Sequence, residues 1–156
     1  MWRSLIRADV PSIKEPAGLL RSDGKRPDGL TQIPWKAGRC MTWDVTVTDT
    51  LAESYLASTS TTAGAVAEGT ASRKELKYQA LASTHAFIPL AFETLGPINS
   101  KAISFFNELG HRLSTLTGEP RETAFLFQRI SIAVQRFNSI CFHGSFTQQA
   151  ELDTDS

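Results

Sequence analysis

The stretch that decides the fold is "RPDGLTQIPWKAGRCMTWDVTVTD", residues 26–49, which reads as two strands joined by a tight turn. Its second half alternates strictly between polar and apolar residues, and the apolar set is Met41, Trp43, Val45 and Val47. Such alternation predicts a strand with one buried face. Residues 28–35 form its expected antiparallel partner, joined through residues 36–38. This pairing brings Asp28 toward the polar face that holds Asp44.

The two aspartates suggest a metal site. A hard cation such as Mg²⁺ takes oxygen ligands from one or two carboxylates, with water and substrate phosphate completing its shell. Asp28 and Asp44 are therefore candidate ligands, and Glu15, just upstream, is a third. Phosphodiester hydrolysis also needs a positive group beside the developing charge. Lys74 and Lys77, three residues apart on one face of the following helix, are candidates for that role.

Ordinary readings compete with each of these assignments. Pro-Asp-Gly is a common turn tripeptide, so Asp28 can simply be a turn residue. Asp44 can be an edge-strand charge that blocks aggregation. Glu15 can be a surface residue before a proline, and the two lysines can belong to a solvated helix face. The sequence leaves these alternatives open.

The remaining elements follow from hydrophobic periodicity and from glycine and proline punctuation. The pattern predicts a helix that starts at residue 1 and ends before Pro11, and a helical region over residues 51–81 with a break near Gly64 and Gly69. "HAFIPLAFETLG" predicts a central strand in which Pro89 requires a bulge or an unpaired position. Ser100 is a candidate cap for a helix that stops at Gly118, and a last helix is expected over residues 120–141.

These elements predict an α/β fold: a mixed β-sheet, made of a meander plus an added strand, flanked by helices. We expect one domain over residues 1–146, because 156 residues with 41% hydrophobic content suffice for one core. The polar, acidic residues 147–156 predict a disordered tail.

The composition of the chain limits which kinds of partner and compartment we expect. Sixteen basic and sixteen acidic residues cancel, so any contact with nucleic acid must come from a local patch. Cys40 and Cys141 lack metal-site spacing and fit free thiols in a reducing, intracellular compartment. No apolar run is long enough to span a bilayer, and the start of the chain does not read as a signal peptide.

A resemblance adds to this reading. "RPDG", then Asp44 in "WDVTVTD" sixteen residues after Asp28, and then "RKELKY" resemble the restriction-endonuclease-like domain that follows the reverse transcriptase in some non-LTR retrotransposons. That domain is a branch of the PD-(D/E)XK nuclease superfamily. The segments "EPAGLLRSDGKRPDGLTQIPW", "AFETLGPINSKA" and "FQRISIAVQRFN" look like the tail of reverse-transcriptase-like open reading frames. The resemblance spans nearly all of residues 2–146.

The resemblance implies Mg²⁺-dependent DNA cleavage, with Mn²⁺ as a possible substitute, and nuclear action on DNA. It implies that Asp28 is the Pro-Asp carboxylate and Asp44 the second metal ligand. Thr46 stands where most of the superfamily has lysine, and the segment Lys74, Lys77 and Tyr78 substitutes for it. It also implies that an upstream reverse transcriptase and the start of the first helix lie outside this chain.

Three functional hypotheses follow. The first is a metal-dependent DNA endonuclease domain of retroelement origin, in which Arg26, Arg129 and Arg136 contact nucleic acid. The second is a catalytically inactive remnant that binds nucleic acid or a protein. A third reading is a structural fragment that is stable only when joined to upstream sequence.

Overall fold

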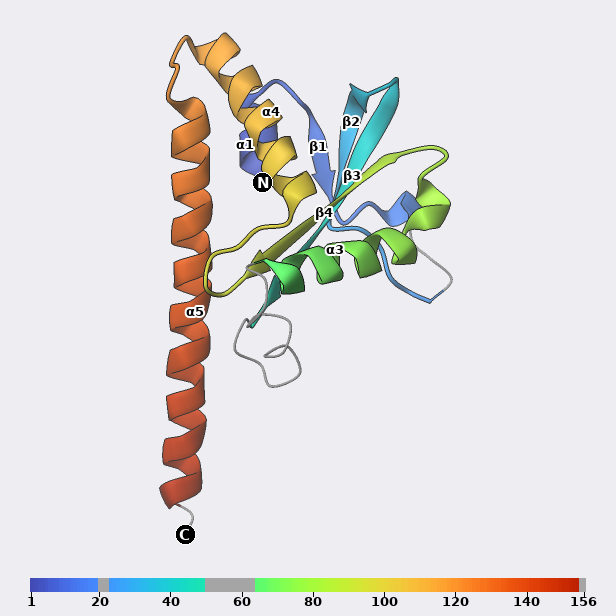
Figure 1. Ribbon diagram of the computed structural model, residues 1–156. Coiled ribbons are helices and arrows are strands. Elements are labelled where there is room, and N and C mark those ends of the chain that lie inside the picture. Colours follow the sequence, from blue (N-terminus) through green and yellow to red (C-terminus); the bar gives the residue numbers. More distant parts are fainter. Residues whose placement is uncertain (20–22, 50–63, 155–156) are drawn as a thin grey trace.

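The computed structural model describes the backbone of residues 1–19, 23–49 and 64–154 and the side chains of these residues up to residue 140 (Figure 1). Its elements in chain order are α1 (Trp2–Arg7), β1 (Ser12–Lys14), the 3-10 turn η1 (Ala17–Leu19), β2 (Gly29–Lys36), β3 (Arg39–Thr48), α3 (Ala65–Lys77), the 3-10 turn η3 (Gln79–Leu81), β4 (Ala86–Glu93), α4 (Ser100–Thr117) and α5 (Glu122–Thr154).

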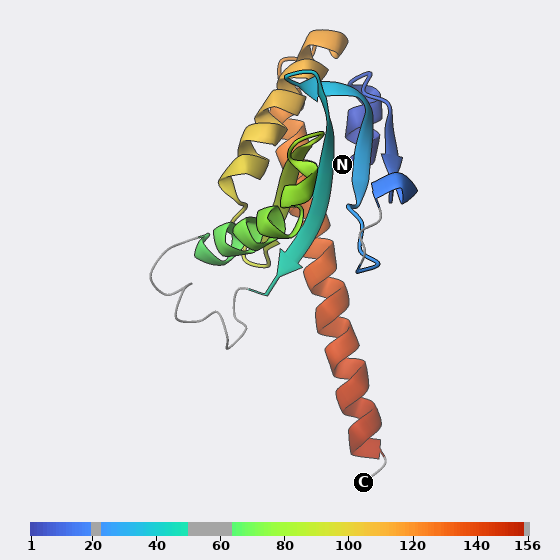
Figure 2. The ribbon, with the colours of Figure 1, turned by 90° about the vertical axis from the view of Figure 1, so that its right-hand side faces the viewer.

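The four strands form one mixed sheet in the order β1-β2-β3-β4. β1 pairs with β2, and β2 with β3, in antiparallel fashion, whereas β3 and β4 are parallel. Figure 2 shows β2 and β3 side by side as a long hairpin. Its turn uses positive φ at Ala37 and Gly38, as a tight two-residue turn requires. The predicted hairpin and the predicted α/β sheet flanked by helices are confirmed.

The position of β4 corrects one prediction. The segment containing Pro89 forms a strand, but this strand lies at the edge of the sheet rather than at its centre. An edge strand tolerates proline because only one side of its backbone needs a partner strand. On the other side of β4, the buried Asn99 side chain binds backbone groups of the strand. Its Oδ1 accepts from Ala91 N at 2.8 Å, and its Nδ2 donates to Pro89 O at 3.0 Å.

The sheet has a strongly apolar face and a more polar one. The apolar face packs against α1, α4 and α5 in the main core, which includes Leu5, Trp35, Met41, Trp43, Leu90, Phe92, Phe105, Phe106, Leu109, Leu113 and Leu126. On the other face α3 lies across β4 and β3, where Ala67 and Ala71 pack on Ala91. Small side chains let α3 approach the sheet closely, and this positions the groups that α3 carries.

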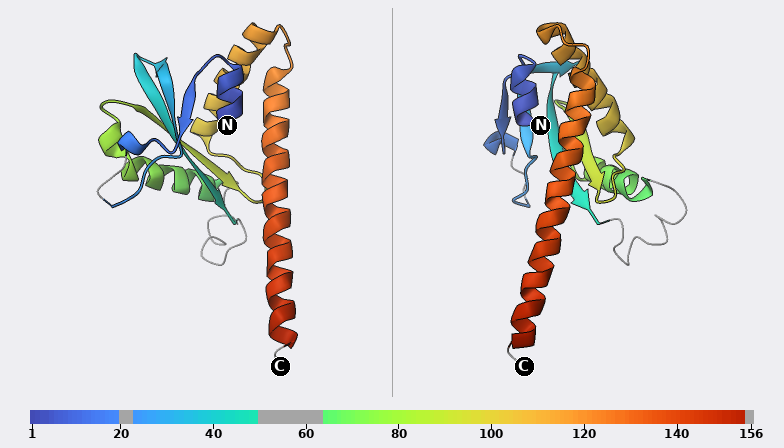
Figure 3. Two further views of the ribbon diagram at one scale, coloured as in Figure 1. Left: turned by 180° about the vertical axis from the view of Figure 1, so that it is seen from behind. Right: turned by 90° about the vertical axis from the view of Figure 1, so that its left-hand side faces the viewer.

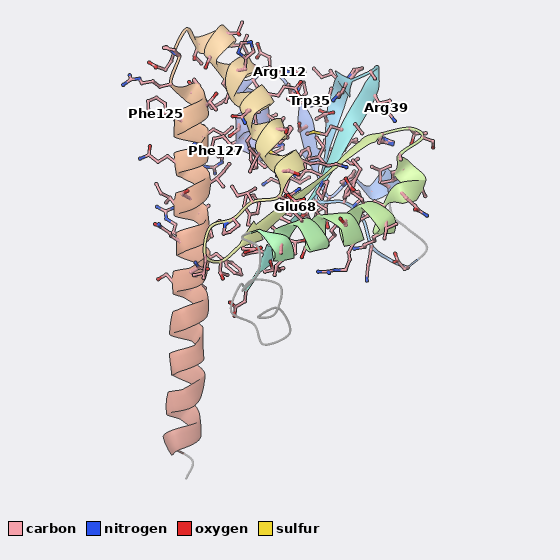
Figure 4. All side chains as sticks on the ribbon, in the orientation of Figure 1. Trp35, Arg39, Glu68, Arg112, Phe125 and Phe127 are labelled. Carbon is pink, nitrogen blue, oxygen red and sulfur yellow. The ribbon has the colours of Figure 1, made fainter. Side chains whose placement is uncertain are left out.

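Single contacts fasten the helices to the sheet. The Arg112 guanidinium lies 3.8 Å from the centre of the Trp35 ring, which joins α4 to β2 (Figure 4). Glu68 of α3 accepts a hydrogen bond from the Ser100 backbone N–H at the start of α4, at 2.6 Å. The buried Glu93 of β4 accepts from Ala67 N in the first turn of α3, at 2.9 Å. A carboxylate at a helix N-terminus satisfies an unpaired N–H and complements the helix dipole.

The helix boundaries refine the sequence-based predictions. Gly64 precedes α3 with φ 81°, whereas Gly69 lies inside α3 without interrupting it. The expected helix over residues 51–63 falls outside the described residues. Asn99, rather than Ser100, occupies the N-cap position of α4, and Gly118 ends that helix with φ 75° as predicted.

The last helix is longer than the sequence predicts. α5 runs from Glu122 to Thr154, so residues 147–154 are helical where a disordered tail is expected. Its C-terminal part extends beyond the other elements (Figure 3). Asn138 Nδ2 donates to Thr94 O at 2.7 Å and ties the middle of α5 to the end of β4. Among the described residues, no helix combines the length and apolarity that a membrane span needs.

Candidate functional site

Asp28 and Asp44 meet at the open end of the β2–β3 hairpin. Gly29 pairs with Trp43, and the same register continued by one residue brings Asp28 beside Asp44. The Asp28 N–H donates to Trp43 O at 2.9 Å, and Asp28 Oδ2 accepts from Val45 N at 2.6 Å. Asp28 therefore binds the β3 backbone on both sides of Asp44. The expected approach of the two carboxylates is present in the structure.

Gly29 makes this approach possible. A Cβ at position 29 would lie 1.9 Å from Cζ2 of the Trp43 indole, so a side chain there would displace the tryptophan. The Pro-Asp-Gly tripeptide is thus not a turn here. Its glycine begins β2 and lets Trp43 pack closely on the neighbouring strand.

Asp44 is a buried carboxylate in an internal strand. The residue is 5% exposed and lies on β3, which has β2 on one side and β4 on the other. Its reading as an edge-strand charge is therefore wrong. A buried carboxylate is costly unless it is paired or otherwise stabilised, so the neighbours of Asp44 decide what it can do.

Lys74 supplies the positive charge. Its Nζ lies 2.6 Å from Asp44 Oδ2, and its side chain is 25% exposed. Lys74 reaches the sheet from the last turn of α3, which crosses the same face that bears Asp44. Of the two candidate lysines, Lys74 is the one that the structure joins to the carboxylates. The ammonium of Lys77 instead lies 4.8 Å from the centre of the Tyr78 ring.

The close approach of Asp28 and Asp44 affects the pKa of Asp28. Its pKa is raised above the ordinary value of 3.8, first because its carboxylate is partly withdrawn from water. The hydrogen bond from Val45 N opposes this effect, while the negative charge of Asp44 and a hydrogen bond between the two carboxyl groups add to it. Lys74 offsets part of the rise. A second negative charge this close disfavours ionisation of Asp28 and favours a bound cation.

The other predicted site residues lie at different distances from this pair. The Glu15 backbone N–H donates to Asp28 O at 2.8 Å, but its side chain is 68% exposed and pairs with Arg26 at 3.1 Å. Arg26 belongs to the loop that leads into Asp28. Arg129 and Arg136 lie on α5, across the sheet from α3, so the structure does not place them beside the carboxylates.

Two features of the site were not predicted. The buried hydroxyl oxygens of Thr42 and Thr46, which flank Asp44 on its face of β3, make no hydrogen bond within the described part of the chain. Tyr78 is 1% exposed, and its hydroxyl donates to Arg26 O at 3.1 Å. The alternation of β3 reveals the threonines in the sequence, but no local pattern reveals the reach of Tyr78 to residue 26.

The donor set fits a divalent cation that keeps most of its water. Within residues 1–19, 23–49 and 64–140, no three His, Cys, Asp or Glu side chains gather into a metal site. Mg²⁺ does not require three, because it is commonly held by one or two carboxylates plus waters and substrate phosphates. Asp28 and Asp44 meet this requirement. The adjacent negative charges also give the pair a reason to bind a cation.

No family model matches this chain, and no curated protein is significantly similar to it. The geometry of Asp28, Asp44 and Lys74 is therefore the main guide to function.

Proposed function

We propose that this chain carries a metal-dependent endonuclease centre of the PD-(D/E)XK, restriction-endonuclease-like type, which hydrolyses phosphodiester bonds in DNA. In this proposal Asp28 and Asp44 hold Mg²⁺ or Mn²⁺ and Lys74 assists the attack. The retroelement origin, the reverse-transcriptase partner encoded upstream and nuclear action on DNA belong to the same proposal.

One observation carries the proposal. Three residues chosen from sequence for one chemistry, Asp28, Asp44 and Lys74, come from a loop, a strand and a helix and converge at the polar face of β3. The convergence is specific to these residues, because the neighbouring candidates Lys77 and Glu15 make other contacts. A carboxyl group with a raised pKa beside a second carboxylate and a lysine is typical of functional sites.

The residues divide the chemistry between them. A divalent cation held here would lower the pKa of a bound water and neutralise charge on the scissile phosphate. Asp28 must be ionised to hold it, and because the pKa of Asp28 is raised, metal binding should weaken as pH falls. Lys74 is partly exposed and can turn its ammonium from Asp44 to a phosphate oxygen, where it stabilises the charge that develops during attack. Asp44 itself is held by β3, which has a partner strand on each side.

The test is nicking of supercoiled plasmid DNA with Mg²⁺ or Mn²⁺. Wild type should nick only with metal, and Asp28→Asn and Asp44→Asn should each lower the rate by at least about 10³-fold. Asp9→Asn is the matched control: it also changes an acid to its amide, at an exposed position with φ 57° that asparagine tolerates. This control should nick like wild type.

Two outcomes would contradict the proposal. Folded wild type without metal-dependent nicking, or nicking that survives in both Asp28→Asn and Asp44→Asn, contradicts the proposal. Cooperative thermal unfolding of each sample establishes that the protein is folded.

A second candidate is the inactive remnant, which keeps the fold and binds nucleic acid or a protein. The ion pair between Lys74 and Asp44 favours it, because this pair already neutralises the buried carboxylate without a metal. A remnant predicts cooperative unfolding with no stabilisation by Mn²⁺. An endonuclease centre predicts a higher melting temperature in the presence of Mn²⁺.

A further inference from the structure

Tyr78 links the parts of the chain that carry the three site groups. It follows directly after α3, and its N–H donates to Lys74 O at 3.1 Å, so it continues the turn that bears the lysine. Its hydroxyl donates to Arg26 O at 3.1 Å, two residues before Asp28. One side chain thus spans the space between the lysine helix and the aspartate loop.

The Tyr78 ring is held from the side of the sheet. Its centre lies 4.9 Å from that of Phe87 on β4, and Phe87 pairs in register with Thr42 of β3. Asp44 lies two residues after Thr42 on the same face of the strand. The ring therefore has a fixed position relative to Asp44. Its hydroxyl in turn holds the loop before Asp28 at a fixed distance from the sheet.

Packing alone does not explain why residue 78 is a tyrosine rather than a phenylalanine. A phenylalanine would fill the same space against Phe87, and the acceptor is the carbonyl of Arg26, an exposed residue in a loop that contains Gly24 at φ 77°. A buried tyrosine usually finds a partner for its O–H, but here the partner lies in the segment that carries a site carboxylate. The fully buried Pro27 side chain and the surface ion pair between Glu15 and Arg26 also restrain this loop, but neither joins it to α3.

We propose that Tyr78 is a positioning residue whose hydroxyl ties the Arg26–Asp28 loop to α3 and thereby sets Asp28 against Asp44 and Lys74. This inference rests on the proposed function for its catalytic meaning. Its structural content is independent of that function: the hydroxyl anchors Arg26, two residues before Asp28, so its loss loosens the loop that leads into the Asp28 carboxylate. A displacement of about 1 Å at such a site is enough to lower a rate by about 10²-fold.

The substitution Tyr78→Phe tests this with a readout that needs neither metal nor DNA. The Val45 amide proton is bound by Asp28 Oδ2, so its hydrogen exchange, measured by NMR on the metal-free protein, reports the position of that carboxylate. Tyr78→Phe should accelerate Val45 exchange at least about tenfold, because local opening controls exchange in a weakly restrained segment. The Met41 amide, which donates to Thr31 Oγ1, should stay within about twofold of wild type.

Thr31→Val is the matched control. It also removes a buried hydroxyl, one that bonds Ile33 O and Met41 N further along the same hairpin rather than a group of the site. It should leave Val45 exchange unchanged within about twofold while lowering the melting temperature at least as much as Tyr78→Phe. A general loss of stability would instead accelerate Val45 equally in both variants, and that result overturns the proposal.

Mn²⁺ affinity and nicking extend the test to function. Tyr78→Phe should weaken Mn²⁺ binding about tenfold and slow nicking about 10²-fold, whereas Thr31→Val should change neither. Unchanged Val45 exchange in Tyr78→Phe overturns the positioning role even if wild type nicks DNA. Faster Val45 exchange in a protein that neither binds Mn²⁺ nor nicks DNA supports the positioning of Asp28 and overturns the proposed function instead.

Discussion

The two faces of β3 are built from alternate residues of one strand, yet they differ in what their side chains can do. On one face Met41 and Trp43 are fully buried in a core that includes aromatic rings of α4. On the other, Thr42, Asp44 and Thr46 lie under a helix whose contact residues are mostly alanine. The apolar face contributes stability through burial. The polar face instead buries a carboxylate that is paired with Lys74 and two hydroxyl groups that find no hydrogen-bond partner within the described residues.

The apolar face of β3 stabilises the fold, whereas its polar face carries the residues of the candidate site. A sheet that only needed stability would be served better by apolar residues at positions 42, 44 and 46. The buried polar groups lie instead beside Asp28 and Lys74, where they support chemistry. Local violations of good packing are expected at functional sites. Substitutions on the two faces should therefore have separable effects.

The largest expected effect is on the apolar face. Trp43→Ala should lower the free energy of unfolding by about 3–5 kcal/mol, because it removes a buried indole that also packs against Gly29. Chemical denaturation with urea measures this loss, and Trp43→Phe should recover much of it. A loss below about 1 kcal/mol would contradict the assignment of this face as the structural core.

On the polar face, Lys74→Met should separate metal binding from catalysis. Removing the ammonium 2.6 Å from Asp44 Oδ2 should tighten Mn²⁺ binding about tenfold, because the cation no longer competes with a positive charge. Nicking should nevertheless fall at least about 10²-fold. Lys77→Met removes the same charge from the next turn and should change Mn²⁺ affinity by less than about twofold. Weaker Mn²⁺ binding by Lys74→Met would argue against this arrangement.

The pH dependence of stability gives a smaller effect. Because the folded state raises the pKa of Asp28, the neutral carboxyl contributes stability that is fully present below the ordinary pKa of 3.8 and is lost as pH rises through the raised pKa. Asp28→Asn keeps the neutral form at every pH. The melting temperature of the metal-free variant should therefore exceed that of wild type increasingly as pH rises from 4 to 7. An equal melting-temperature difference at all pH values would contradict the raised pKa.

The smallest effect is expected at Glu15. Its exposed side chain pairs with Arg26 rather than turning toward Asp28 and Asp44. Glu15→Gln should therefore change Mn²⁺ affinity by less than about twofold and the free energy of unfolding by less than about 1 kcal/mol. Titration with Mn²⁺ followed by electron paramagnetic resonance measures the affinity. A loss of tenfold or more would make Glu15 a third metal ligand.

Much of the sheet and the core of the site could be predicted from the sequence. The alternation around Trp43 fixes which residues of β3 share a face, and the short turn at Ala37 and Gly38 sets the partner strand. Together they bring Asp28 toward Asp44. Lys74 was one of two candidates on a helix, and the sequence alone could not choose between them.

The rest depended on tertiary packing that no local pattern encodes. The place of β4 at the sheet edge follows from its parallel pairing with β3 and from Asn99, which satisfies the free side of its backbone. The choice of Lys74 over Lys77 depends on how α3 crosses the sheet. The contact between Tyr78 and Arg26 joins residues 52 positions apart, beyond the reach of sequence periodicity.

The most direct test of the central claim is the stoichiometry of Mn²⁺ binding by calorimetry. The account predicts that wild type binds one Mn²⁺ per chain and that Asp28→Asn and Asp44→Asn each abolish this binding while remaining folded. No binding by folded wild type, or binding that persists in both variants, would contradict the claim that these two carboxylates form a metal centre.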